Sequence, residues 1–238
     1  MYLLTGKPNT GKSTAIKTLI ELLGPSRCDG FYTQEILSDK DRIGFKTITL
    51  SGNEFVFAHI DFPKTFAIEE FGVDIDAFEK IALQALNSDK KYLIIDEIGP
   101  MQLFSSSFQE FLGKLSDSDK KVIATICKED NEFTALLKER NKDHLFELTM
   151  ENRNEMPFIL ATQLNKDDPL YLSKLELSQK YHQEKERFSY EQGKIILRST
   201  HDIRTIERIN GHYKCSCDYF QENDTCSHIM AVIRNSIS

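Results

Sequence analysis

Hydrophobic residues in the first two thirds of the chain fall into two patterns, short continuous runs and stretches with helical spacing. The runs at 1–5, 92–95 and 122–126 are mainly apolar, which is typical of strands buried on both faces of a sheet. Segments 14–23 and 108–115 instead space their apolar residues three and four positions apart, as amphipathic helices do. Strands that alternate with helices predict an α/β fold built on a mostly parallel, doubly wound sheet.

A different pattern follows the first predicted helix. Segments 30–37, 43–50 and 54–59 read as three strands, separated by the short polar turns 38–41 and 51–53. Turns this tight connect antiparallel neighbours. We therefore expect these strands at one edge of an otherwise parallel sheet.

The remaining elements define the predicted domains. Helical spacing recurs from Asp74 to Ala85, with Asp74 or Asp76 as its cap, and again over 133–140, and a further strand is expected at 145–150. Together these elements predict a first domain over 1–165, a partly helical polar linker over 166–192 and a small second domain over 193–238.

The second domain has its own strand and helix signals. Segments 194–199 and 205–209 read as short strands, and 227–237 reads as a terminal helix. Between Ile209 and Tyr213, the pair Asn210-Gly211 predicts a tight hairpin turn.

Composition narrows the class of protein. The chain has 238 residues, 40% of them hydrophobic, and a net charge of −7. It has no apolar run of the roughly eighteen residues that cross a membrane, and we expect a cytoplasmic protein with no membrane partner. From Lys166 onward, basic and acidic residues balance at 11 each, so the first domain carries the negative charge. An acidic domain argues against broad nonspecific adhesion to nucleic acid.

The loop between the first predicted strand and helix has the spacing of a phosphate-binding loop, with two glycines followed by lysine and serine. Gly6 and Gly11 allow backbone angles that turn successive N–H groups toward phosphate oxygens. Lys12 would place a cation at the β and γ phosphates, and the Ser13 hydroxyl would ligate Mg²⁺. The residues expected to bind the nucleotide are Gly6, Lys7, Pro8, Asn9, Thr10, Gly11, Lys12, Ser13 and Thr14.

A second element would complete a catalytic site. The apolar run 93–95 ends in Asp96-Glu97, at the strand end where ligands bind in open α/β sheets. Asp96 would hold Mg²⁺ through its water shell, and Glu97 would orient or deprotonate the attacking water. The ordinary alternative is a solvated acidic cap after a strand.

Phosphoryl transfer usually needs a further cation. Arg42, Arg140 and Arg153 are the candidates in the first domain. We favour Arg153, which follows a predicted strand. Arg42 lies in an edge turn, where a solvated hairpin charge is an equally good interpretation, and Arg140 suits the C-terminal end of an exposed helix.

The cysteines near the C-terminus have the spacing of a metal site. Five cysteines without an export signal favour a metal over disulfides. Three thiolates and one imidazole form a closed tetrahedral set for a structural zinc ion, and the alternative is a chance cluster of reduced thiols. The expected ligands are Cys215, Cys217, Cys226 and His228, with His201 and His212 as less favoured substitutes.

Residues 1–165 resemble the small P-loop nucleoside-triphosphatase family related to nucleotide kinases. That resemblance implies Mg²⁺-dependent hydrolysis of nucleoside triphosphates such as ATP and GTP to diphosphates, with loose base preference. Pro100 and Gln102 depart from the family pattern of Lys and Met-Glu after the acidic pair, which puts substrate range or rate in doubt. The segments that carry the resemblance are 6–14, 30–36, 42–45, 96–101, Phe108 and Asn152-Arg153.

The segment 195–233 resembles a SWIM-type zinc finger, a ββα module linked to binding DNA or proteins. The segment from Lys185 to Lys214 contains seven basic and four acidic residues, which gives mild support for DNA binding. A protein partner is at least as plausible, because a solvated face explains the same small excess.

The sequence therefore predicts a Mg²⁺-dependent nucleoside triphosphatase with a structural zinc finger. A phosphotransferase that passes the γ-phosphoryl group to an acceptor hydroxyl would use the same parts. A slow nucleotide-dependent switch that sets the position of the finger is the second alternative.

Overall fold

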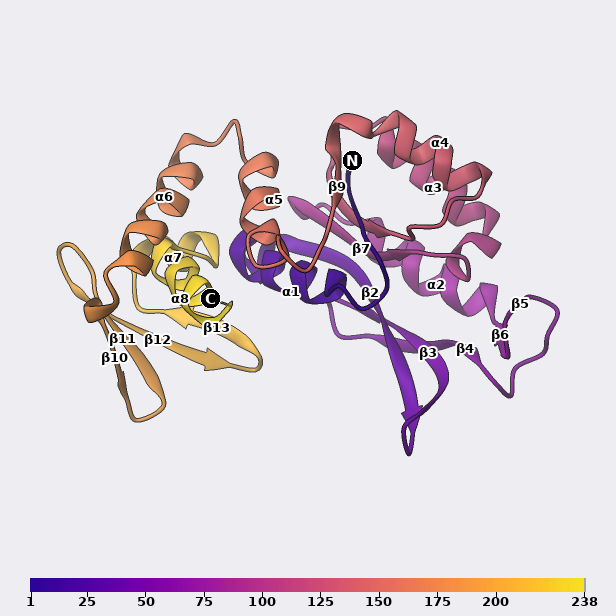
Figure 1. The fold of residues 1–238 in the computed structure, drawn as a ribbon, viewed down its shortest axis with the longest axis horizontal. Coiled ribbons are helices and arrows are strands. Elements are labelled where there is room, and N and C mark those ends of the chain that lie inside the picture. The colour runs from indigo at the N-terminus through magenta and orange to yellow at the C-terminus, as the bar shows by residue number, and fades with distance from the viewer. Residues whose placement is uncertain (238) are drawn as a thin grey trace. The chain divides into compact units, whose positions relative to one another are not determined.

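A computed structural model describes residues 1–237 of the chain (Figure 1). The described chain forms two compact units. The first unit contains residues 1–13 and 28–150, and the second contains residues 14–27 together with the chain from Glu151 onward. The second unit is therefore discontinuous in sequence, because residues 28–150 are inserted between its two parts.

The first unit is built on a nine-stranded sheet with the order β5-β6-β4-β3-β2-β7-β8-β1-β9. The strands β2, β7, β8, β1 and β9 are parallel, and β3, β4, β6 and β5 pair antiparallel at one edge, which confirms the predicted mixed sheet. The short edge strands β5 and β6 have no signal in the sequence pattern. The strands are β1 (Tyr2–Thr5), β2 (Cys28–Ser38), β3 (Asp41–Thr49), β4 (Glu54–His59), β5 (Ala67–Ile68), β6 (Phe71–Val73), β7 (Tyr92–Ile98), β8 (Lys121–Ile126) and β9 (Leu145–Glu147).

Two central strands of this sheet approach one another closely at a glycine. Gly30 of β2 pairs with Ile94 of β7, and it has a φ of +120°. A Cβ atom at Gly30 would lie 2.0 Å from the carbonyl oxygen of Ile94. Only glycine fits at this position.

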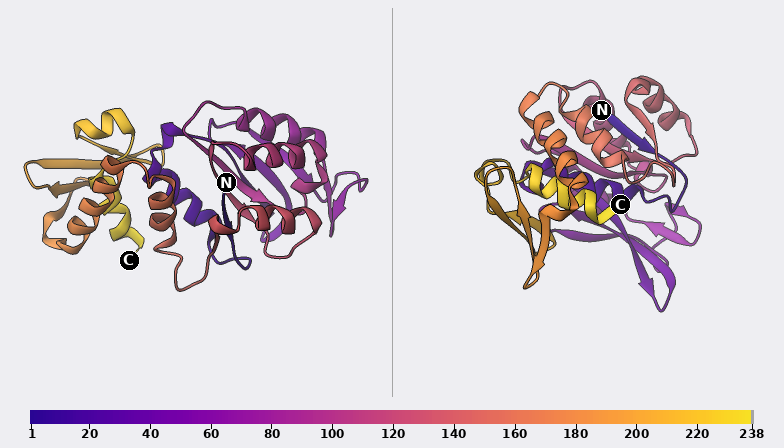
Figure 2. Two further views of the ribbon diagram at one scale, coloured as in Figure 1. Left: turned by 90° about the horizontal axis from the view of Figure 1, so that it is seen from above. Right: turned by 60° about the vertical axis from the view of Figure 1, so that its left-hand side comes forward.

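Three helices of the first unit pack with one face of its sheet, and α2 and α3 run side by side (Figures 1 and 2). Each begins at a side chain that accepts a backbone hydrogen bond, which is the standard N-cap arrangement. Asp74 caps α2 as predicted, and Ser105 and Asn131 cap the other two. The helices are α2 (Ile75–Leu86), α3 (Ser106–Ser116) and α4 (Glu132–Arg140).

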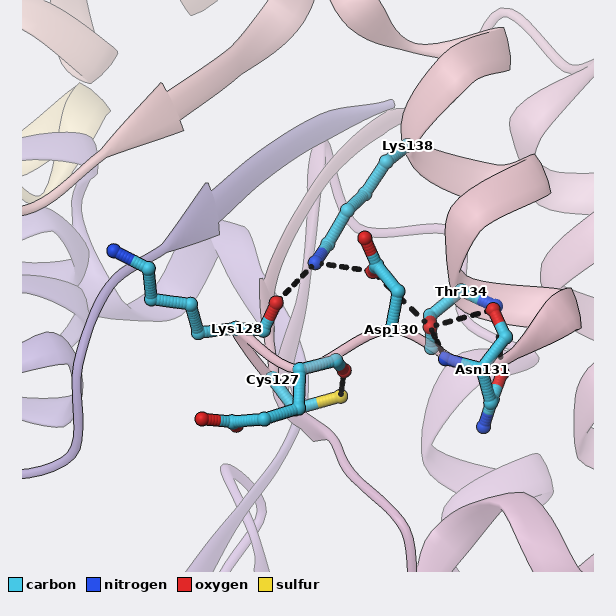
Figure 3. A network of polar contacts seen from close by, with 7 residues as sticks. Cys127, Lys128, Asp130, Asn131, Thr134 and Lys138 are labelled. Carbon is cyan, nitrogen blue, oxygen red and sulfur yellow. Dashed lines mark hydrogen bonds and ion pairs between the residues drawn. The ribbon is translucent and has the colours of Figure 1, made fainter.

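The loop between β8 and α4 is fixed by polar contacts (Figure 3). Asn131 and Thr134 form a reciprocal capping box at the start of α4. Lys138 reaches back to the carboxylate of Asp130 at 2.6 Å and to the carbonyl of Lys128 at 3.1 Å. The loop leaves β8 at the C-terminal end of the parallel strands, the edge at which the predicted acidic pair lies.

The second unit contains a four-stranded antiparallel sheet in the order β10-β11-β12-β13. Asn210 and Gly211 have φ values of 51° and 86° between its last two strands, which confirms the predicted hairpin turn. The predicted strands at 194–199 and 205–209 and the terminal helix are also present, whereas β10, α5 and α7 carry no recognised signal. The elements are α1 (Lys12–Leu23), which begins in the first unit, α5 (Met156–Leu164), α6 (Pro169–Gln183), α7 (Asp218–Asn223), α8 (Ser227–Ile237), β10 (Phe188–Glu191), β11 (Lys194–Arg198), β12 (Ile203–Ile209) and β13 (His212–Cys215).

The segment 166–192, which the sequence predicts as a partly helical linker, includes a helix. It contains α6, which packs with α8, and the side chains of Tyr171 and Tyr181 are buried. The compact units also group the chain differently from the predicted domains, since α1 and α5 belong with the C-terminal segments. None of the helices within 1–237 has the length and apolarity that crossing a bilayer requires.

Candidate functional site

The phosphate-binding loop connects β1 to α1 through a conformation that needs glycine. Gly6 has a φ of +154°, and a Cβ atom there would lie 2.6 Å from the carbonyl oxygen of Leu148. Gly11 has a φ of +97°, and Asn9 is also left-handed at 62°. Positive φ angles of this kind let a loop turn successive N–H groups toward an anion.

Lys12 lies across this loop at the start of α1. Its Nζ atom donates to the carbonyl oxygens of Gly6 at 3.0 Å and Lys7 at 3.2 Å. The Thr10 hydroxyl donates to the same Lys7 carbonyl at 2.9 Å. Helix N-termini attract anions through their free N–H groups and dipole, so the loop and the first turn of α1 form a cationic cradle.

Asp96 and Glu97 lie near the end of β7, at the C-terminal edge of the parallel strands. Asp96 is only 3% exposed, and its Oδ1 atom accepts a hydrogen bond from Thr125 Oγ1 of neighbouring β8 at 2.5 Å. Thr125 is therefore a residue that sequence reasoning missed. Its signal was a polar residue near the end of the mainly apolar strand β8.

Glu97 lies in a less polar environment than an exposed glutamate. Burial raises the pKa of its carboxyl group, the charge of Asp96 raises that pKa further, and the Lys12 ammonium lowers it. The effect of Lys12 means that the lysine of the phosphate-binding loop and the acidic pair share one electrostatic site. A carboxylate with a raised pKa is better matched to accepting a proton near neutral pH.

Gly99 makes room for two side chains of this site. A Cβ atom at Gly99 would lie 2.7 Å from Glu97 Oε1 and 2.9 Å from Gln102 Oε1. Gln102 is 3% exposed, and its amide donates to Thr33 Oγ1 of β2 at 3.3 Å. Gln102, one of the two residues that differ from the family pattern, thus lies beside Glu97 and not at the protein surface.

These residues fit a triphosphate with a bound Mg²⁺ ion. The loop places the Lys12 ammonium beside its own backbone, and Ser13 and Asp96 offer the hydroxyl and carboxylate oxygens that Mg²⁺ prefers. The donor set is hard and oxygen-rich, as the predicted chemistry requires.

The three candidate arginines differ in their surroundings. Arg42 pairs with Glu35 at 3.1 Å and lies over the ring of Phe45, with 5.4 Å from its Cζ to the ring centroid, so the structure ties it to the β2–β3 hairpin. Arg140 ends α4 on the surface. Arg153 is exposed in the turn before α5 and belongs to the second unit.

The predicted zinc ligands come together in the second unit. The ligand atoms of Cys215, Cys217, Cys226 and His228 all lie within 4.8 Å of one another, and all four residues are buried. Cys215 ends β13, and the other three lie at the beginnings of α7 and α8. Four ligand atoms this close together can surround one tetrahedral ion.

The surroundings of this cluster also fit zinc. Burial raises the pKa of the Cys226 thiol, so an ion is needed to hold that thiol as the anion. The N–H of Ile229 points to the Cys226 sulfur at 3.5 Å, and the ring of Tyr181 stacks on His228 with 5.7 Å between centroids. These contacts fix the orientation of two ligands.

The substitute histidines do not join this cluster in the described structure. His212 Nδ1 instead lies 2.5 Å from Glu21 Oε1 of α1. His201 lines a neighbouring hollow of about 350 Å³ that also includes Tyr181 and Arg204.

Sequence comparisons match two separate segments of the chain. The model of the family described as NTPase matches residues 1–161, and that of the SWIM zinc finger matches residues 208–236. The nucleoside-triphosphatase THEP1 of Thermotoga sp. (strain RQ2) is 42% identical over 157 residues, which cover 65% of this chain and 89% of the relative. A cancer-related nucleoside-triphosphatase of Homo sapiens is 35% identical over 171 residues, which cover 64% of this chain and 90% of the relative.

Solved structures show the same relationship. The crystal structure of THEP1 from Aquifex aeolicus superposes with a TM-score of 0.61 at 32% identity, over 68% of this chain and 98% of the other. The solution structure of a human cancer-related nucleoside triphosphatase gives a TM-score of 0.57 at 28% identity, over 69% of this chain and 97% of the other. Both matches leave about a third of this chain uncovered.

Proposed function

Because the chain belongs to the NTPase family, we propose that it hydrolyses nucleoside triphosphates such as ATP and GTP to the diphosphate and inorganic phosphate. The observation that carries this proposal is the environment of Glu97, a largely buried carboxylate within the electrostatic reach of Lys12. A base beside the phosphate-binding cation is the arrangement that activation of water for attack on the γ-phosphorus requires.

The roles of the residues follow from their chemistry. The loop amides and Lys12 bind the β and γ phosphates, and Glu97 accepts a proton from the attacking water as the bond from the γ-phosphorus to the bridging oxygen breaks. Ser13 and Asp96 would hold Mg²⁺, which neutralises phosphate charge when bound. Thr125 orients the Asp96 carboxylate through its hydrogen bond. Arg153 is our candidate for the additional cation.

Product analysis tests the reaction. The purified chain is incubated with Mg²⁺ and γ-labelled ATP or GTP, and the products are separated by thin-layer chromatography. Hydrolysis gives labelled inorganic phosphate. A labelled acceptor in place of free phosphate would show a phosphotransferase, and absence of turnover with tight binding would favour the switch.

For the second unit, we propose a protein partner ahead of nucleic acid. Several basic residues of this region are already paired within the chain, including Lys194 with Glu207 at 3.1 Å and Lys214 with Asp224 at 3.2 Å. Such pairs leave less charge for phosphate contacts. Ile203 of β12 is 66% exposed. Binding to labelled duplex DNA with a steep salt dependence would contradict this proposal.

A further inference from the structure

The C-terminal end of α1 is held by the zinc module, defined here as residues 203–237. The carbonyl oxygen of Leu22 accepts hydrogen bonds from Thr225 Oγ1 at 2.9 Å and from the Tyr171 hydroxyl of α6 at 3.0 Å. All three residues are fully buried. The last carbonyls of a helix have no partner within the helix, so these two hydroxyls supply donors that α1 itself cannot.

A second contact lies one residue earlier in α1. The carboxylate of Glu21 accepts from the backbone N–H of Tyr213 at 3.2 Å, and its other oxygen lies 2.5 Å from His212 Nδ1. The Glu21 side chain is only 14% exposed. This carboxylate therefore fixes the β12–β13 hairpin of the zinc module to the helix.

The turn after α1 makes a third contact. The N–H of Ser26 donates to Asp224 Oδ2 at 2.7 Å, and Lys214 binds the other oxygen of Asp224 at 3.2 Å. Gly24 has a φ of +93°, and a Cβ atom there would lie 2.5 Å from the carbonyl oxygen of Asn223. The backbones of the turn and of the zinc module thus meet without room for a side chain.

All these contacts of the zinc module come from two short segments beside the zinc ligands. Segment 212–214 leads directly into Cys215, and segment 223–225 leads directly into Cys226. A bound ion fixes the distance between the two cysteines and therefore between the two segments. Without an ion, the two segments would lose the metal bonds that join Cys215 to Cys226.

The opposite end of α1 carries the phosphate-binding residues Lys12 and Ser13. The helix has 12 residues, and at 1.5 Å per residue it is about 18 Å long. A helix of this length transmits a change at one end to the other as a shift or rotation of the whole element. Lys12 and Leu22 thus belong to one continuous helix.

We propose that the zinc site is an allosteric site of the nucleotide-binding loop, with zinc occupancy raising nucleotide affinity through α1. The proposal rests on the proposed nucleotide site and gives the zinc module a function within its own chain. Linkage makes the effect reciprocal, so bound nucleotide must raise zinc affinity by the same factor.

Two equilibrium measurements test this coupling. A fluorescent, non-hydrolysable ATP analogue is titrated with Mg²⁺ into the zinc-loaded protein and into protein whose zinc has been removed by a chelator that is then separated off. We expect zinc removal to weaken binding of the analogue by about 5- to 150-fold, the usual range for coupled sites. Competition with a chromophoric zinc chelator, with and without the analogue, should give the same factor.

Variants in which the zinc ligands are unaltered distinguish a loss of coupling from a loss of fold. Glu21→Gln and Thr225→Val should retain one zinc, bind the analogue more weakly than the unaltered protein, and respond less to zinc removal. The control is Asp202→Asn, which removes the carboxylate that pairs with Arg204 in the same unit. This variant should leave the zinc content and the affinity for the analogue unchanged.

Each outcome has a defined meaning. If the zinc-loaded protein does not bind the analogue, the proposed nucleotide site is wrong and the coupling falls with it. If the analogue binds equally well to the loaded protein, to folded zinc-free protein and to both variants, the coupling alone is wrong. If the zinc-free protein does not stay folded, the two zinc-retaining variants decide the question.

Discussion

His212 of β13 lies beside Glu21 of α1, with 2.5 Å between the imidazole Nδ1 and the carboxylate, although 191 positions separate them in the sequence. This pair joins the hairpin that leads to the zinc ligands to the helix that follows the phosphate-binding loop. The NTPase family model matches residues 1–161, which include Glu21, and the SWIM model matches residues 208–236, which include His212. The pair therefore links the two matched segments of the chain.

Removing the loop lysine should weaken nucleotide binding. Lys12→Ala deletes the cation that lies across the loop, and hydrogen bonds to charged groups contribute about 1.5–3 kcal/mol. We expect affinity for a fluorescent ATP analogue to fall by about 10- to 100-fold. Lys40→Ala, in the exposed turn between β2 and β3, serves as the control and should bind normally.

Neutralising the proposed base should separate binding from turnover. Glu97→Gln keeps the size of the side chain and removes its ability to accept a proton. We expect near-normal nucleotide affinity and a fall in phosphate release of about 10²- to 10⁴-fold. Glu110→Gln, on the surface of α3, should retain full activity, and unchanged turnover in Glu97→Gln would reject the assigned role.

A methyl group at Gly99 should disturb the base indirectly. The added Cβ would meet the ends of the Glu97 and Gln102 side chains at less than 3.0 Å, so both must move. These are flexible side chains, and we therefore expect Gly99→Ala to fold, to bind nucleotide and to lose turnover. Equal losses of affinity and rate would point to a wider rearrangement of the loop.

Two glycines of the first unit should respond to alanine in opposite directions. Gly30→Ala places a Cβ 2.0 Å from a backbone carbonyl, where nothing can give way, and we expect a loss of about 3 kcal/mol or more. Gly113 lies within α3 with open space around it, and Gly113→Ala should stabilise by about 0.5–1 kcal/mol. Chemical denaturation of both variants measures the difference.

Loss of one ligand should release the metal. Cys217→Ser replaces a thiolate in a set of four, and we expect zinc, measured by plasma mass spectrometry, to fall from near one equivalent to a small fraction. Cys127→Ser alters a thiol of the first unit and should keep the zinc. Full zinc content in Cys217→Ser would mean that another residue serves as the fourth ligand.

The sequence pattern predicts the central strands and helices well because their apolar residues repeat at the periods of buried strands and amphipathic helices. Ile94 and Leu112 are examples of residues whose burial follows from such a pattern. Helix α7 has no signal in the sequence, because its six residues are too few to display a period. The hairpin turn at Asn210-Gly211 was predictable because its backbone angles demand those residues.

The candidate site shows the same limit. Local motifs identify Lys12, Asp96 and the zinc ligands, since their spacing is itself the signal. The supporting contacts of Thr125 and Gly99 arise from strands and turns that are adjacent only in the folded chain. The role of Glu21 is harder still to predict, because its partners lie at the other end of the sequence.

The discontinuity of the second unit has a consequence for synthesis. Leu22 and Thr225, whose hydrogen bond closes the end of α1, are 203 residues apart. At about 5–20 residues per second, a ribosome needs roughly 10–40 s to add the second partner after the first. Nascent α1 therefore emerges well before the Thr225 hydroxyl that binds its C-terminal end. The hydrogen bonding of this first helix is completed only when the last segment has been translated.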